Sequence, residues 1–163
     1  MGKPAGESKP ATTLDSDPTH CPECGTVLSA DTTCREHFHA LLFLEAEAPD
    51  AGLLAHFYAV ATYVLQHPAS MGYTVAAIAG LRTAVADALT GKADTAGLRR
   101  RHSALAGGPA RITRRQDEPI PKWPASNWPM IVTDIIAGGA DEYATNVEKW
   151  ARVTLDTLDS FAP

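Results

Sequence analysis

The chain has 163 residues, of which 45% are hydrophobic and 20% are charged, and its formal net charge is −5 at pH 7. This length and balance suit one soluble domain with its own core. The acidic balance gives no reason to expect a nucleic-acid partner, and no apolar run approaches the length of a membrane span. The N-terminal residues lack the apolar centre of a signal peptide, so we expect a cytoplasmic protein.

Residues 1–18 are polar and rich in Pro, Ser, Thr and Gly, with almost nothing to bury. We predict a disordered tail there, followed by a single helical zinc-binding domain over residues 19–163.

The first chemical motif is Cys21-Pro22-Glu23-Cys24-Gly25. Two cysteines at this spacing can hold one face of a tetrahedral Zn²⁺, and the glycine allows the backbone to turn with a positive φ. Cys34 is the only other cysteine, so a fourth ligand would be a histidine. The alternative is that the three cysteines are unrelated thiols.

Two helices that fold back on each other follow this motif. One is predicted from Cys34 through residues 35–47, with a cap among residues 29–33, and the turn signal Pro-Asp-Ala-Gly ends it. The other is predicted over residues 53–66, where Pro68 stops it. The expected inward stripes are Cys34, Phe38, Leu41, Leu42 and Glu45 on the first helix, and Leu53, His56, Val60, Tyr63 and His67 on the second.

In such a hairpin, residues whose numbers sum to roughly 99 lie opposite each other. Cys34 then lies within a turn of His67, whereas His56 lies opposite Phe43 and near Glu45. At ~1.5 Å per residue, His56 and His67 are about 16 Å apart and cannot bind one ion. We therefore predict a Zn²⁺ site of Cys21, Cys24, Cys34 and His67, with His56 or His20 as alternatives for the fourth ligand.

The remaining chain continues the helical pattern. Helices are predicted over residues 73–89, 93–105, 130–137 and 141–161. Four prolines forbid a long helix over residues 111–129, so we expect an extended segment that buries Ile120, Trp123 and Trp128.

No strand pattern stands out. The predicted fold class is all-α: a small helical bundle with an N-terminal zinc knuckle stapled to a helical hairpin. The residues expected to face inward from the last helix are Tyr143, Val147, Trp150, Val153 or Thr154, Leu158 and Phe161.

Other polar groups suggest further roles. Glu45 and His56, together with Tyr63, could form an acid/base pair or half of a second metal site, or simply a hydrogen-bonded pair. Tyr63 and Gln66 could instead orient His67. The basic cluster Arg99–Arg115 could contact a phosphate or an acidic partner, or be a solvated face.

These residues resemble the uncharacterised bacterial domain-of-unknown-function family 5946. The similar positions are Cys21, Cys24, Gly25, Cys34, His56, Tyr63, Gln66, His67 and Pro68, with Val132-Thr133-Asp134-Ile135 and Val147-Glu148-Lys149-Trp150-Ala151 further on. Two positions depart from the pattern: Arg35 stands where an aromatic residue is favoured, and Ala61-Thr62 precede Tyr63 where Asp is frequent. The resemblance implies a metal site and a helical fold, but no reaction.

From the sequence we expect a small zinc-binding protein with a structural Cys₃His site. Its role would be binding or accessory, with an unknown protein or a small molecule as partner. The alternative is a metal-dependent enzyme that activates a thiol or water with the metal and the Glu45/His56 pair.

Overall fold

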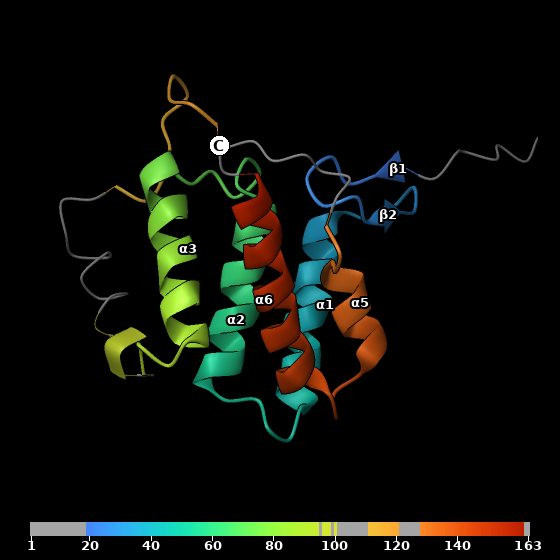
Figure 1. Ribbon diagram of the computed structural model, residues 1–163. Coiled ribbons are helices and arrows are strands. Elements are labelled where there is room, and N and C mark those ends of the chain that lie inside the picture. Colours follow the sequence, from blue (N-terminus) through green and yellow to red (C-terminus); the bar gives the residue numbers. More distant parts are fainter. Residues whose placement is uncertain (1–18, 95, 99, 101–110, 121–127, 162–163) are drawn as a thin grey trace, which may run out of the picture.

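The computed structural model describes residues 19–94, 96–98, 100, 111–120 and 128–161, so the predicted tail lies outside the described residues. The described part is mostly helical, as predicted (Figure 1). Among the described residues, no helix combines the length and apolar character needed to cross a membrane. The elements are β1 (Thr19–His20), β2 (Val27–Leu28), α1 (Cys34–Glu47), α2 (Leu53–Gln66), α3 (Val75–Leu89), α5 (Val132–Gly138) and α6 (Tyr143–Ser160).

The sequence predicted no strand, but β1 and β2 form a two-residue antiparallel pair around the first cysteine motif. The pair is too short to show the alternation of apolar and polar residues that reveals a strand. Its structural effect is to close the Cys21–Thr26 loop, which becomes a hairpin turn.

Helix α1 begins where its local sequence dictates. The Thr33 hydroxyl accepts a hydrogen bond from the Glu36 N–H at 3.3 Å, and the Glu36 carboxylate accepts one from the Thr33 N–H at 2.5 Å. This reciprocal capping box satisfies two backbone donors that have no partner within the helix. It makes Cys34 the first helical residue, with its side chain buried.

Helix α2 is the centre of the bundle. Helices α1, α3 and α6 all pack against it, and α6 runs alongside it (Figure 1). Every residue from Ala61 to Gln66 is consequently buried. The predicted inward stripe of α2 is wrong at its start, because Leu53 and His56 are exposed. A helix that several neighbours cover buries residues all round its axis, so a single inward stripe does not describe α2.

Among the residues that the structure describes, the largest fully buried side chain is Trp150 of α6, which anchors this core. Its indole N–H donates to the Met130 carbonyl at 3.1 Å, and the Gln66 amide donates to the same carbonyl at 2.9 Å. The Gln66 amide also donates to the Thr154 hydroxyl at 3.0 Å. The sequence predicted that either Val153 or Thr154 faces inward, and Thr154 is the buried one. These bonds join α2, α6 and the segment that leads into α5.

The segment 111–120 is extended only in part: residues 111–114 lie beside the start of α3, and residues 115–118 form a turn in which the Glu118 N–H donates to the Arg115 carbonyl at 3.2 Å. Thr113 forms an isolated antiparallel bridge with Tyr73, and the Thr74 N–H donates to the Ile112 carbonyl at 2.8 Å. The prediction that Ile120 is buried is wrong, because it is 39% exposed. Trp128 is partly buried, and Trp123 lies outside the described residues. Of the helix predicted over 93–105, residues 96–98 and 100 are helical, and most of the others lie outside the described part.

Because Trp150 fills the centre of the core, we predict that Trp150→Ala lowers the free energy of unfolding by about 3–5 kcal/mol. Trp150→Phe should cost less, since it loses the indole donor but keeps a ring. Phe43→Ala is the matched control: its ring is 71% exposed, so the change should stay within about 0.5 kcal/mol. Urea unfolding followed by circular dichroism measures all three, and equal losses for Trp150→Ala and Phe43→Ala would contradict the assignment.

Candidate metal centre

The first two cysteines lie on the tight turn between β1 and β2. The Cys21 N–H donates to the Thr26 carbonyl at 2.8 Å, and the Gly25 N–H donates to the Cys21 carbonyl at 2.9 Å. Gly25 has a φ of 79°, which a residue with a side chain rarely adopts. The turn brings both thiols into the interior, where Cys21 and Cys24 are buried.

The other two residues lie at opposite ends of the helical hairpin, and the fold brings those ends together. Cys34 is the first residue of α1, and His67 is the residue that caps the C-terminus of α2. Pro68 follows and prevents the helix from continuing in its regular form. Because the two helices run antiparallel, the start of α1 lies beside the end of α2 (Figure 1).

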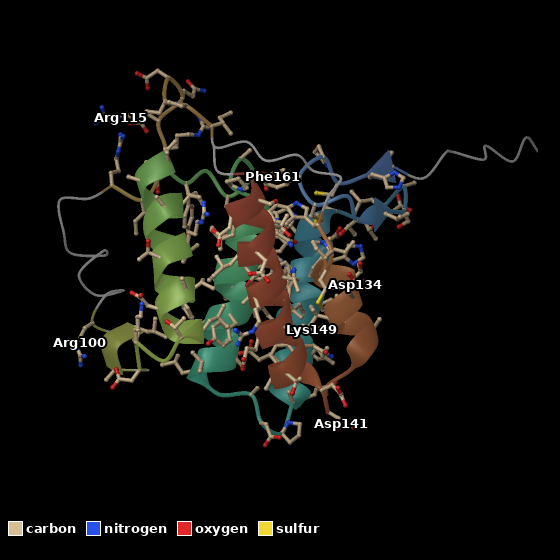
Figure 2. The ribbon with its side chains drawn as sticks, viewed as in Figure 1. Arg100, Arg115, Asp134, Asp141, Lys149 and Phe161 are labelled. Carbon is tan, nitrogen blue, oxygen red and sulfur yellow. The ribbon has the colours of Figure 1, made fainter. Side chains whose placement is uncertain are left out.

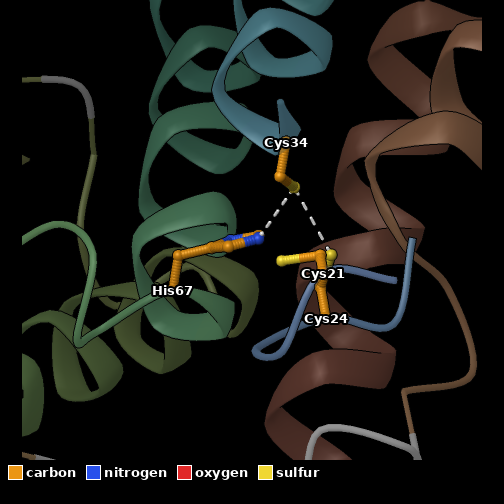
Figure 3. A group of neighbouring side chains, drawn as sticks. All are labelled: Cys21, Cys24, Cys34 and His67. Carbon is orange, nitrogen blue, oxygen red and sulfur yellow. Dashed lines mark hydrogen bonds between the residues drawn. The ribbon is translucent and has the colours of Figure 1, made fainter. Parts of the chain in front are cut away.

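The side chains of Cys21, Cys24, Cys34 and His67 converge on one point (Figure 3). Their candidate ligand atoms all lie within 4.8 Å of one another, and all four residues are buried. The Sγ atoms of Cys24 and Cys34 are 3.5 Å apart, and the Cys34 Sγ is 3.1 Å from the His67 Nε2. Bonds of ~2.3 Å to sulfur and ~2.0 Å to nitrogen place tetrahedral ligands roughly 3.5–3.8 Å apart. The four residues could therefore hold a metal ion after small adjustments.

The imidazole of His67 is oriented by its own helix. Nδ1 lies 2.8 Å from the Tyr63 carbonyl oxygen, which requires a proton on Nδ1 and leaves Nε2 facing the Cys34 sulfur. The Tyr63 ring stacks on the imidazole with centroids 3.9 Å apart, and Phe38 stacks on the other side of Tyr63 at 4.1 Å. The predicted orienting role of Tyr63 thus has a structural basis. Gln66 faces α6 instead and makes its hydrogen bonds to Met130 and Thr154.

Short contacts within the cluster shift the pKa values of Cys21, Cys34 and His67. Hydrogen bonds from the Cys24 and Cys34 thiols lower the pKa of Cys21, and donation to Cys21 and Cys24 raises the pKa of Cys34. Burial lowers the pKa of His67, but hydrogen bonds to Cys21 and Cys24 outweigh it and raise that pKa to about 9. Hydrogen bonds between the thiols and the imidazole therefore join these side chains at the point where a cation could bind.

Two hydroxyl groups lie next to the sulfur atoms of the candidate metal centre. The fully buried Thr26 has its Oγ1 3.0 Å from the Cys24 Sγ, so its hydroxyl can donate to a thiolate there. Burial raises the pKa of the Tyr63 phenol, and so do the charge of Cys34 and a hydrogen bond to it. Two of the three sulfur atoms therefore have a protonated hydroxyl beside them.

The model of the family of unknown function DUF5946 matches residues 19–159. The chain belongs to this family. No curated protein and no solved structure matches it.

No other histidine that the structure of this DUF5946 protein describes belongs to the cluster. His20 pairs with Val27 on β1 and is exposed, and His102 lies outside the described residues. The His56 imidazole donates to the Glu45 carboxylate, with Nδ1 and Oε1 2.9 Å apart. Among the described residues, the only group of four that could hold a metal is the one with His67.

The predicted Glu45–His56 contact is present, but its third member is different. Tyr63 lies at the cysteine cluster, and the buried Tyr143 of α6 donates to the other Glu45 oxygen at 2.6 Å. Nothing in the sequence distinguishes Tyr143 from an ordinary core residue of an amphipathic helix. The His56 side chain is 48% exposed, so this is a partly solvated pair, not a buried one. It joins α1, α2 and α6 at the end of the hairpin opposite the cysteines.

The predicted basic cluster is not a single patch in the part of the chain that the structure describes. Arg100 and Arg115 lie near opposite ends of α3 (Figure 2). Arg111 is paired with Glu118, and Arg114 donates to the carbonyls of Arg115 and Glu118. Arg99 and Arg101 lie outside the described residues.

Histidine variants separate the two candidate ligands. We predict that His67→Ala loses stoichiometric metal and lowers stability, because one of four buried donors disappears. His56→Ala should keep the metal, because that side chain bonds to Glu45 at the other end of α2. Mass-spectrometric metal analysis of the purified proteins measures this. Metal retained by His67→Ala and lost by His56→Ala would reverse the assignment.

Proposed function

We propose that this DUF5946 protein binds one Zn²⁺ at Cys21, Cys24, Cys34 and His67, and that the ion is structural. The single observation that carries the proposal is the convergence of four buried donor atoms from three separate segments of the chain. A structural zinc site has four protein ligands in a tetrahedron, whereas a catalytic one keeps a position open for water.

The donor set supports zinc over other ions. Thiolate ligands favour zinc, copper(I) or iron–sulfur clusters, and imidazole suits zinc. Calcium and magnesium prefer oxygen ligands, and no carboxylate belongs to the group. Three thiolates with one imidazole is a recurrent structural zinc set.

The surroundings of the sulfur atoms support a structural ion over a reactive one. A hydrogen bond from Thr26 to the Cys24 sulfur withdraws charge from a bound thiolate and weakens it as a nucleophile. The orientation of His67 by the Tyr63 carbonyl and ring fixes the fourth position. Such fixed, buried ligands suit an ion that holds the fold together.

The alternative is an enzyme that uses the metal and the Glu45/His56 pair on one substrate. His56 and His67 are eleven positions apart on one helix, which is about 16 Å. A metal-bound water or thiolate at one end cannot share a proton with His56 at the other. The distance therefore favours a binding or accessory role over this mechanism.

The proposed setting is a reducing cytoplasm, which keeps the three cysteines available to the metal. The partner would be a protein or a small molecule. The net charge of −5 and the pairing of Arg111 with Glu118 disfavour a nucleic acid.

Cobalt replacement tests whether the site is closed. We expect one ion per chain, and a Co²⁺ derivative with the strong visible absorption of a tetrahedral thiolate site. Because no position is open, azide and cyanide should leave this spectrum unchanged. A spectrum that shifts with added anion would show an exchangeable ligand and favour the catalytic alternative.

Removal of the metal tests its contribution to stability. A chelator should lower the midpoint of thermal unfolding, because the ion binds the folded chain and not the unfolded one. Acidification should release the ion, since its ligands bind metal only when deprotonated. Calorimetry with and without chelator measures the first effect, and a colorimetric zinc indicator measures the second. A purified, reduced, metal-free protein of unchanged stability would contradict a structural role.

A further inference from the structure

Glu23 stands between the first two cysteines and extends its side chain to a different segment. Its carboxylate accepts the Ala69 N–H at 2.8 Å and the Ser70 N–H at 3.2 Å. These two amides follow Pro68, directly after the candidate ligand His67. One carboxylate thus joins the loop that carries two candidate ligands to the turn that carries the fourth.

The turn after His67 is also held by bonds that do not reach the cysteine loop. His67 has left the helical conformation, with φ −128° and ψ 48°, although its imidazole still donates to the Tyr63 carbonyl of α2. The Met71 N–H donates to the His67 carbonyl at 3.0 Å and closes the turn on itself, and the Gly72 carbonyl at its end accepts the Arg114 N–H at 2.7 Å. The contact with Glu23 connects this turn directly to the cysteine loop.

A second contact holds Glu23 from the opposite side. Its backbone carbonyl accepts the Trp128 indole N–H at 2.9 Å. The indole belongs to the segment that leads into α5, and its ring is partly buried against the core. The loop is therefore held between this segment and the His67 turn through a single residue, and both contacts are independent of a metal ion.

We propose that Glu23 is a positioning residue for the zinc site: its carboxylate holds the His67 turn against the cysteine loop, so that the imidazole meets the three sulfur atoms already aligned. This inference rests on the proposed zinc function. Charge-assisted bonds from a carboxylate to two backbone amides are strong enough for this role. Groups that orient metal ligands typically change metal affinity about 10–100-fold when they are removed.

Zinc dissociation from the folded holoprotein tests this role, with excess chelator as the acceptor. We expect Glu23→Ala to raise the dissociation rate at least about tenfold. Glu23→Gln keeps one acceptor oxygen and the shape of the side chain, so it should give a smaller increase and guards against misfolding of the alanine variant. In the metal-free protein, the Ala69 and Ser70 amides should also lose protection from hydrogen exchange in both variants.

Asp94→Asn is the matched control. The Asp94 carboxylate also accepts a backbone N–H, from Gly97 at 2.7 Å, but it lies beyond the far end of α3 from the His67 turn. It should leave zinc dissociation unchanged. If Glu23→Ala and Glu23→Gln release zinc at the wild-type rate, the positioning role is wrong while the zinc site stands. If the wild-type protein binds no stoichiometric zinc, the proposed function itself fails.

Discussion

Three sulfur atoms and one imidazole nitrogen, buried within 4.8 Å of one another, join the β1–β2 turn to the outer ends of α1 and α2. Buried thiolates repel each other and lose their hydration, so without a cation the cluster must hold protons. A divalent ion relieves this repulsion and leaves a single negative charge on three thiolates. Hydroxyl groups such as that of Thr26 lie where they can offset this remaining charge. The chemistry of the cluster thus favours a metal at the meeting point of the β-hairpin, α1 and α2.

The helical hairpin makes this meeting possible through its length and its endpoints. Helices α1 and α2 have 14 residues each, so each is about 21 Å long and their outer ends reach the same level. The capping box at Thr33 determines where α1 begins, and Pro68 limits where α2 ends. Local sequence signals therefore place Cys34 and His67 at the outer ends, and the antiparallel packing of the two helices brings them together.

These local signals explain how much the sequence could predict. Hydrophobic spacing, helix caps and prolines predict the helices and the position of His67 relative to Cys34. Each of these signals depends only on residues that are close together in the chain. The exposure of His56 and the partnership of Glu45 with Tyr143 depend on how α6 packs against α2, which no local pattern encodes. The contact of Glu23 with residues 69 and 70 joins positions 46 and 47 apart in the chain. A glutamate between two cysteines carries no sequence sign of such a partner.

The two ends of the helical hairpin are held together by different kinds of contact. At the end with Cys34 and His67, the contacts are made by soft donors in a dry interior, which suits a metal. At the other end, Glu45 bridges Tyr143 and the half-exposed His56 by hydrogen bonds, where water remains close. If an ion binds there as proposed, its loss would loosen one end of the hairpin, while the covalent turn and the Glu45 bridge keep the other end closed. An ion at the first end can thus control the cysteine loop and the His67 turn without rebuilding the core around Trp150.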